Sequence, residues 1–221
     1  MEDLHWAGLD WDEGPDLGGP FAPYAQSEQT NYFRAALTRL RERGHLFACT
    51  CSRRDLAEAA VAPHDETGEP LYPGNCRAQL KPPPGAEFSW RFRVPDGETI
   101  TFVDGRLGQQ RFVAGRDFGD FVVWRRDDAP AYELAVVVDD ARMQVTEVVR
   151  GEDLLVSTAR QLLLYRALEQ TPPAFYHCLL LRNRAGRRLA KRDAALSLRD
   201  LRARGIRPEM LPALAANPIP A

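Results

Sequence analysis

The chain has 221 residues, of which 44% are hydrophobic and 27% are charged, and its formal net charge is −2. These values are ordinary for a globular protein and allow one large domain or two small ones. The longest apolar runs, such as residues 134–138, are too short to cross a bilayer, and the acidic start of the chain does not have the form of a signal peptide. Four cysteines, three of them within residues 49–76, favour the reducing cytoplasm over a disulfide framework.

The first predicted elements are a helix and a strand. Apolar residues within residues 27–43 recur on one helical stripe, with Ser27 placed to cap the helix and Gly44 to end it. Residues 46–50 predict a short strand that leads into the first two cysteines. Residues 52–55 have the pattern of a second, short helix at its beginning.

The middle of the chain predicts an irregular segment followed by short strands. Residues 61–87 are rich in proline, glycine and glutamate, which suits a long irregular segment if something such as a metal organises it. Apolar residues then alternate between Trp90 and Phe102, and Asp104 with Gly105 marks a turn. This pattern predicts a meander of short strands.

From residue 120 onward, strands and helices alternate. The predicted elements are, in chain order, a strand at 121–124, a turn at 127–130, a helix at 132–142, a strand at 145–149, a capped amphipathic helix at 157–168 and a buried strand at 178–181. Nearly continuous apolar strands between helices are typical of a parallel α/β sheet. The sequence therefore predicts half of a nucleotide-binding fold with a β-rich insertion before it.

Three of the cysteines have a spacing that suits a metal site. Cys49 and Cys51 lie one residue apart, and Cys76 follows after a long excursion. Thiolates are strong zinc ligands, and a structural zinc ion usually has four ligands. The fourth donor would be Tyr72 or His64, and a tyrosine ligand would need the metal to deprotonate it. The alternative is two buried cysteines beside a core tyrosine.

A basic segment lies near the end of the chain. Residues 182–192 carry six basic side chains and no acidic one, and further arginines follow at 199, 202, 204 and 207. Such runs commonly contact phosphates, although a solvated loop has the same composition.

Several segments together resemble one enzyme family. Residues 9–14, 24–28, 49–53, 132–140 and 149–154 resemble, in the same order, segments of glutamyl-tRNA synthetase catalytic domains. The most similar member is the short paralogue, glutamyl-Q tRNA(Asp) synthetase, on the cysteine pattern, on residues 189–199 and on the early end of the chain. The resemblance covers most of residues 4–205. It implies the α/β fold of class I synthetases, which is Rossmann-like, here without its first strand and its HIGH-motif segment and with a β-rich, zinc-bearing insertion.

The resemblance also implies a division of the chain. The expected parts are a remnant of the first half of the catalytic fold at 1–45, the zinc-bearing insertion at 46–118, the second half of the catalytic fold at 119–204 and a short tail at 205–221. The implied metal is one structural Zn²⁺ on Cys49, Cys51, Tyr72 and Cys76. Cys178 is outside this set and is expected in the core.

The implied activity is a two-step ligase reaction. L-Glutamate would be activated by ATP, with Mg²⁺, and then transferred to the queuosine base of tRNA(Asp), by a protein that acts as a monomer and engages no membrane. Arg150 matches the family's glutamate-binding arginine, and its guanidinium suits a carboxylate. Tyr132 matches the tyrosine that hydrogen-bonds the amino acid.

A loop with the role of the class I KMSKS motif is expected at residues 188–192. This segment comprises Arg188, Leu189, Ala190, Lys191 and Arg192. Lys191 would bind ATP and offset the charge that develops on the triphosphate as pyrophosphate leaves. Ala190 replaces the usual serine, which removes a hydroxyl but leaves the cation.

The family's opening segment, with its first strand and HIGH signature, has no match in the chain. Because that segment supplies donors to the ATP phosphates, we expect the 221-residue chain to be weak or inactive in ATP–pyrophosphate exchange with glutamate. Two other interpretations stay open: a piece of a glutamyl-tRNA synthetase, or a non-catalytic tRNA-binding or regulatory module. The second would bind tRNA with a steep salt dependence and would not activate glutamate.

Overall fold

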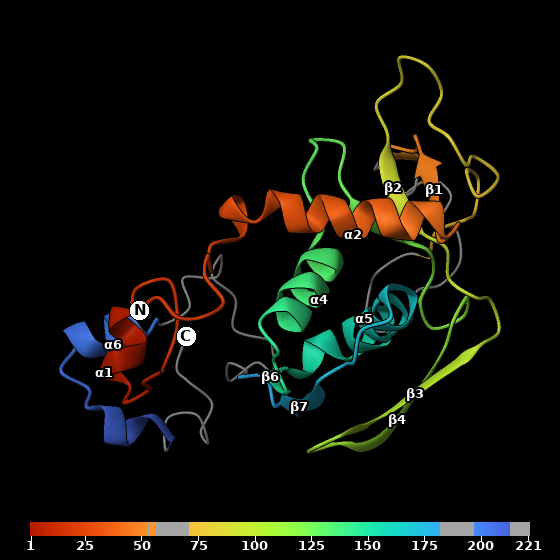
Figure 1. Ribbon diagram of the computed structural model, residues 1–221. Coiled ribbons are helices and arrows are strands. Elements are labelled where there is room, and N and C mark those ends of the chain that lie inside the picture. The colour runs from red at the N-terminus through yellow and green to blue at the C-terminus, as the bar shows by residue number, and fades with distance from the viewer. Residues whose placement is uncertain (53, 56–70, 182–196, 213–221) are drawn as a thin grey trace. The chain divides into compact units, whose positions relative to one another are not determined.

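The computed structural model describes residues 1–52, 54–55, 71–181 and 197–212 (Figure 1). The chain divides into two compact units. The larger unit comprises residues 23–177, and the smaller comprises both terminal segments, 1–22 and 178–221. Within the described part of the chain, no helix has both the length and the apolar character that crossing a membrane requires.

A three-stranded antiparallel sheet lies at one end of the larger unit. Its strands are β1 (Leu46–Cys49), β2 (Ser89–Phe92) and β5 (Phe121–Trp124), in the order β1-β2-β5. Every residue of β1 and β2 is buried, so both faces of these strands are covered. The sheet fixes the end of β1, where the first of the three clustered cysteines lies.

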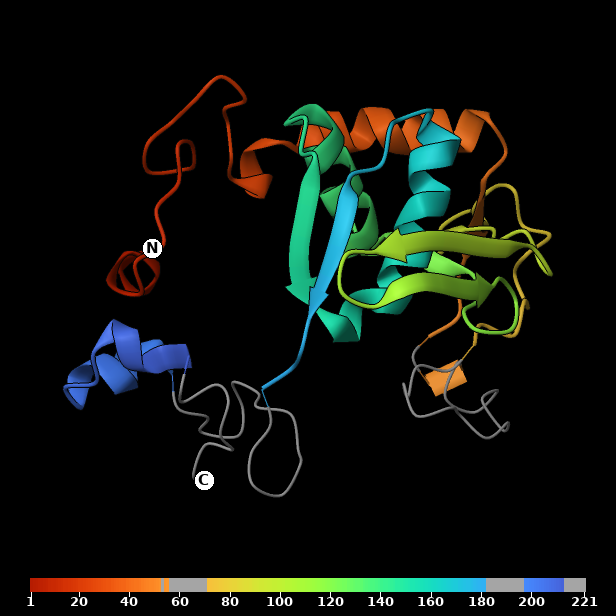
Figure 2. The same ribbon diagram turned by 90° about the horizontal axis from the view of Figure 1, so that it is seen from below.

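A four-stranded sheet lies under the helices of the larger unit. Its strands are β3 (Thr99–Asp104), β4 (Gly108–Val113), β6 (Glu147–Gly151) and β7 (Ala174–Cys178), in the order β4-β3-β7-β6. Strands β3 and β4 form an antiparallel hairpin, whereas β3 and β7 are parallel, with Asp104 opposite Phe175. Figure 2 shows these strands side by side, with the helices behind them.

Three helices pack together on one side of this sheet: α2 (Thr30–Glu42), α4 (Tyr132–Arg142) and α5 (Leu155–Leu168), with α2 packed against both α4 and α5. The short 3₁₀ turns η1 (Gln26–Glu28) and η2 (Glu152–Leu154) precede α2 and α5. Helix α5 is buried on most of its surface, and its Leu163 and Leu164 join Leu40, Leu134 and Phe175 in one hydrophobic core. This core holds the ends of β6 and β7 in fixed positions.

The smaller unit contains short helices only, among the residues that the structure describes. They are α1 (Glu2–Trp6), α6 (Leu198–Ala203) and the 3₁₀ turn η4 (Pro208–Met210). Helix α6 begins with a capping box, in which Ser197 and Asp200 satisfy each other's backbone N–H groups. Arg202 lies 3.5 Å from a carboxylate oxygen of Glu2, which links the two terminal segments.

Most of the predicted elements are confirmed. Helix α4 has the predicted bounds, and β1 and β5 lie where the apolar runs placed them. The predicted start of a short helix at 52–55 is supported by reciprocal hydrogen bonds between Ser52 and Asp55. The expected turn at 127–130 is present, with Asp128 in the left-handed region. The division of the chain at residues 46–118 stays a prediction.

The predicted pairing of the strands was partly wrong. Strand β2 does not continue into β3 as a meander, because β2 pairs with β1 and β5 while β3 pairs with β4 and β7. The sheets are also not uniformly parallel, since β1, β2 and β5 are antiparallel. Periodicity identifies a strand but not its neighbours, so the alternation between residues 90 and 102 could not reveal two separate sheets.

Three predicted boundaries were also wrong. Helix α2 begins at Thr30 after a 3₁₀ turn that contains Ser27, so Ser27 is not its cap. Helix α5 begins at Leu155, without a side-chain cap, and is buried rather than amphipathic. The last strand is Ala174–Cys178 instead of 178–181, and Leu179 is 69% exposed. The apolar run at 178–181 therefore follows the strand rather than forming it.

A largely buried ion pair joins the irregular segment to the end of β2 and the start of β5. Arg77 donates through Nε and Nη2 to the two oxygens of Asp120, at 2.5 and 2.8 Å. The Asp120 side chain is only 3% exposed, and it also accepts a hydrogen bond from the Val94 amide. Arg77 in turn donates to the Val94 carbonyl. One guanidinium thus fixes the segment that carries Tyr72 and Cys76.

We predict that Asp120→Asn lowers the free energy of unfolding by about 3 kcal/mol, because it removes the buried one of the two carboxylates that pair with the Arg77 guanidinium and leaves only the more exposed Asp96. Urea unfolding followed by circular dichroism measures this change. The control is Asp127→Asn, which removes the partner of Arg125 at an exposed site and should cost less than about 1 kcal/mol. Equal losses in both variants would contradict the role given to Asp120.

Candidate functional site

The three clustered cysteines converge on one point in the structure. Cys49 ends β1, Cys51 follows in the next turn, and Cys76 comes from the irregular segment. Their Sγ atoms all lie within 4.8 Å of one another, and those of Cys51 and Cys76 are 3.5 Å apart. The Tyr72 hydroxyl lies 3.5 Å from Cys49 Sγ and 3.7 Å from Cys51 Sγ. All four residues of the expected ligand set therefore meet.

The donor set has the chemistry and spacing of a tetrahedral metal site. With Zn–S bonds of about 2.3 Å, the sulfurs of a tetrahedral site lie roughly 3.8 Å apart. The 3.5 Å separation of the Cys51 and Cys76 sulfurs is close to this value, and Cys49 Sγ lies within 4.8 Å of both. Three thiols could therefore hold a metal ion, with the Tyr72 hydroxyl beside them as a fourth donor. His64, the alternative donor, lies outside the described residues.

The surroundings of the cluster favour the thiolate of Cys76 but the neutral forms of Cys51 and Tyr72. Burial would raise the pKa of the Cys76 thiol, but hydrogen bonds from Tyr72, Thr50 and Cys51 outweigh it and lower that pKa to about 7. Burial raises the pKa of Cys51 to about 11 and also raises the pKa of Tyr72. A bound cation would therefore have to deprotonate these two groups.

Two arginines support the cluster from outside. The Arg91 guanidinium lies 4.3 Å from the centre of the Tyr72 ring, and the Cys76 amide donates to the Tyr72 hydroxyl at 2.9 Å. Both contacts would stabilise a phenolate. Arg126 donates to the carbonyl oxygens of Thr50 and Cys51, at 2.5 Å each, which fixes the turn between the first two cysteines.

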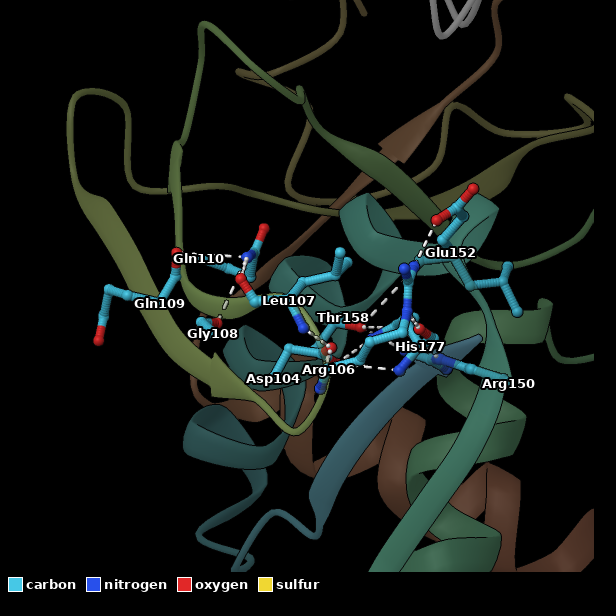
Figure 3. Close-up of polar contacts among 11 residues, drawn as sticks. Asp104, Arg106, Leu107, Gly108, Gln109, Gln110, Arg150, Glu152, Thr158 and His177 are labelled. Carbon is cyan, nitrogen blue, oxygen red and sulfur yellow. Dashed lines mark hydrogen bonds and ion pairs between the residues drawn. The ribbon is translucent and has the colours of Figure 1, made fainter. Parts of the chain in front are cut away.

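Arg150 lies in a second polar cluster, at the end of β6. Its Nε donates to His177 Nε2 at 3.2 Å, and its Nη2 donates to Thr158 Oγ1 at 2.6 Å (Figure 3). The guanidinium also packs over the Phe175 ring, at 5.3 Å from its centre. Its Nη1 is buried and has no hydrogen-bond partner among the described residues. A buried donor of this kind is costly unless a ligand satisfies it.

Behind Arg150 lies a fully buried pair, His177 on β7 and Asp104 at the end of β3. His177 Nδ1 and Asp104 Oδ2 are 2.6 Å apart, and neither side chain is exposed. His177 Nε2 also lies 3.0 Å from Thr158 Oγ1. These residues were not predicted from the sequence, because a single histidine and a turn aspartate give no local signal of a shared site.

Tyr132 begins α4, and its side chain is 52% exposed. The next residue, Glu133, is buried and accepts a hydrogen bond from Gln161 at 2.7 Å. Burial raises the pKa of Glu133, and the positive charge of Arg150 acts in the opposite direction. The start of α4 is therefore within electrostatic range of Arg150. The predicted KMSKS-like segment, including Lys191, lies outside the described residues.

Comparison with known proteins identifies the family. Residues 1–215 match the family described as tRNA synthetases class I (E and Q), catalytic domain. This match covers nearly the whole chain. The chain belongs to the class I tRNA synthetase family.

Its similar relatives in this family fall into two groups. The chain is 53% identical to a glutamyl-Q tRNA(Asp) synthetase of Symbiobacterium thermophilum, over 95% of this chain and 66% of that protein. It is 46% identical to one from Nitratidesulfovibrio vulgaris, over 93% of this chain and 65% of that protein. It is also 42% identical to glutamate–tRNA ligase 2 of Acidithiobacillus ferrooxidans, over 93% of this chain and 44% of that protein. The chain thus spans about two thirds of the first two relatives.

The fold agrees with solved members of the same family. A glutamate tRNA ligase from Elizabethkingia meningosepticum, in complex with its amino acid, superposes with a TM-score of 0.72 at 28% identity. The superposition covers 88% of this chain and 41% of that one. This result confirms the predicted class I synthetase fold.

We predict that Cys76→Ser abolishes stoichiometric metal binding, because a hydroxyl is a much weaker ligand than a thiolate. Elemental analysis of protein purified in the presence of zinc measures the bound metal. The matched control is Cys178→Ser, which changes a cysteine outside the cluster and should retain the ion. The metal content of Tyr72→Phe is then compared with that of His64→Ala, and the variant that loses metal identifies the fourth donor. Full metal content in Cys76→Ser would contradict the assignment.

Proposed function

We propose that these residues form the catalytic region of a glutamyl-Q tRNA(Asp) synthetase, which activates L-glutamate with ATP and transfers it to the queuosine base of tRNA(Asp). The observation that carries this proposal is the 53% identity to a relative of that name over 95% of the chain. The Arg150 guanidinium, with its unpartnered buried Nη1, supports recognition of a carboxylate substrate.

The proposed chemistry has two steps. A carboxylate oxygen of glutamate attacks the α-phosphorus of ATP, forming glutamyl-adenylate as the bond to pyrophosphate breaks. The queuosine base then takes the glutamyl group, and AMP leaves with the electron pair of the cleaved acyl–phosphate bond. Arg150 and Tyr132 would hold the amino acid. Lys191, in the segment 188–192, would offset the charge on the departing pyrophosphate, with Mg²⁺ bound to the phosphates.

The metal in this proposal is one structural Zn²⁺ held by Cys49, Cys51, Tyr72 and Cys76. It would tie the irregular segment to the end of β1, and it would take no part in the reaction. This role is supported by the position of the cluster, in which ligands from two distant segments meet around buried sulfurs.

The acceptor specificity is tested with two preparations of tRNA(Asp) that differ only in queuosine. We predict that glutamate from a radiolabelled pool is attached to the queuosine-containing tRNA and that the queuosine-free tRNA accepts less than a hundredth as much. The assay should be run with the 221-residue chain and with the longest reading frame that contains it. Exchange of pyrophosphate into ATP, measured in parallel, reports the first step alone.

The second candidate is a glutamate–tRNA ligase, which the 42% identity to the Acidithiobacillus protein favours. Such an enzyme would charge tRNA(Glu) at its 3′ end, and the presence of queuosine in tRNA(Asp) would make no difference. Charging of tRNA(Glu), with no dependence on queuosine, would replace the first proposal with this one. Binding of tRNA without any use of glutamate would exclude both.

Arg150→Lys tests the amino-acid site. Lysine keeps the positive charge but loses the planar fork that binds a carboxylate, so we predict that the KM for glutamate rises by about tenfold to a hundredfold. The KM for ATP should change little, because in this proposal the nucleotide is bound by the segment 188–192 and not by Arg150. Arg111→Lys, on an exposed position of β4, is the matched control. An unchanged KM for glutamate in Arg150→Lys would exclude this arginine from the site.

A further inference from the structure

A chain of buried hydrogen bonds runs from the β3–β4 turn to Arg150 (Figure 3). It begins at Asp104, whose Oδ1 accepts from the amides of Arg106 and Leu107, at 3.1 and 2.9 Å. The other oxygen, Oδ2, faces the amide and Nδ1 of His177, at 3.1 and 2.6 Å. Burial alone would raise the pKa of Asp104, but the His177 side chain and the amides of Leu107 and Arg106 outweigh it and lower that pKa. Asp104 is therefore a carboxylate in the folded protein.

The hydrogen bonds determine which tautomer His177 adopts. A guanidinium has only donors, so the contact between Arg150 Nε and His177 Nε2 requires that Nε2 accepts. The ring proton must then lie on Nδ1, where it is donated to Asp104 Oδ2. The contacts with Asp104 at Nδ1 and with Arg150 at Nε2 therefore require the same tautomer of the imidazole. The arrangement works only if Asp104 is an acceptor and Nε2 carries no proton.

We propose that Asp104 and His177 are positioning residues for Arg150, which hold its guanidinium in the plane and rotation that present Nη1 to the substrate carboxylate. This inference rests on the proposed binding of glutamate by Arg150. With Nε bound to His177 and Nη2 bound to Thr158, Nη1 remains as the buried donor without a partner. The two partners therefore select which nitrogen faces the ligand.

The β3–β4 turn has a second connection to the same strands. Arg106 donates through Nε to the carbonyl oxygen of His177 and through Nη2 to Glu152, each at 2.5 Å. His177 is on β7, and Glu152 directly follows β6. The turn thus contacts the ends of both strands that carry the Arg150 cluster. This contact supports the backbone, whereas the contact through Asp104 determines the tautomer.

Asp104→Asn separates these two effects. Asparagine keeps the size of aspartate but offers an amide that no longer requires a proton on His177 Nδ1. In serine proteases, the same change behind the catalytic histidine leaves the geometry intact and favours the wrong tautomer. A proton on Nε2 would face the Arg150 Nε donor, so the guanidinium would have to rotate away. We expect the KM for glutamate to rise by about tenfold to a hundredfold, with an unchanged KM for ATP.

Nitrogen NMR of histidine-labelled protein provides a readout that packing alone would not change. Wild-type His177 should show a protonated Nδ1 and an unprotonated Nε2, and Asp104→Asn should reverse or mix this assignment. The matched control is Asp117→Asn, which removes a carboxylate that accepts from the Val113 amide beside the same hairpin. It should leave both the His177 spectrum and the KM for glutamate unchanged.

Two substitutions of His177 separate positioning from packing. In His177→Gln, the amide oxygen can reach the place of Nε2 and accept from Arg150. In His177→Asn, the shorter amide reaches only the place of Nδ1. Both variants lose the ring, so a packing role predicts similar defects. A positioning role predicts that glutamine retains a KM for glutamate at least about fivefold closer to wild type than asparagine does.

Failure of the positioning role and failure of the proposed function give different results in these experiments. A wild-type protein that neither binds nor activates glutamate, in calorimetry and pyrophosphate exchange, overturns the proposed function and the inference with it. A wild-type protein that uses glutamate, together with an unchanged KM in Asp104→Asn, overturns the inference alone. A raised KM for glutamate, a changed tautomer and an unaffected Asp117→Asn variant support it.

Discussion

The arrangement of the larger unit depends on one buried carboxylate. Asp104 ends β3, caps the turn into β4 through two backbone amides and binds both the amide and the ring of His177 on β7. Strands β3 and β7 are parallel with Asp104 opposite Phe175, and the Asp104 side chain adds two contacts to His177 on β7 to this pairing. The same carboxylate orients the imidazole on which the Arg150 guanidinium rests. The pairing of β3 with β7 and the orientation of the proposed glutamate-binding arginine therefore share one buried carboxylate.

The two polar clusters differ in the kind of group that could complete them. Two nitrogens of Arg150, Nε and Nη2, donate to partners in the protein. The third, Nη1, has no partner among the described residues and is the donor that a ligand could satisfy. Around the cysteines, three thiols lie close together beside a phenol. A cation would bind to these groups as its ligands and balance their negative charge. One cluster is therefore suited to an anionic substrate, and the other to a metal ion that holds the fold.

Local patterns allowed several of these features to be predicted from the sequence. The helix predicted at residues 132–142 has the bounds of α4, and the spacing of Cys49, Cys51 and Cys76 indicated a metal site whose residues do converge. The partners of Arg150 could not be found in this way. Asp104 and His177 are 73 positions apart, and they meet only because β3 and β7 pair in parallel. Which strands become neighbours depends on contacts between residues far apart in the sequence, which periodicity does not encode.

The cysteine cluster also affects how the protein withstands oxygen. The sulfurs of Cys51 and Cys76 are 3.5 Å apart, and a disulfide bond would need a further approach of only about 1.5 Å. A coordinated metal would keep these sulfurs apart and occupy the lone pairs that an oxidant attacks. Loss of the metal and formation of a disulfide are therefore competing fates of the same atoms. A chelating agent, which is often added as a precaution, would favour the oxidised product.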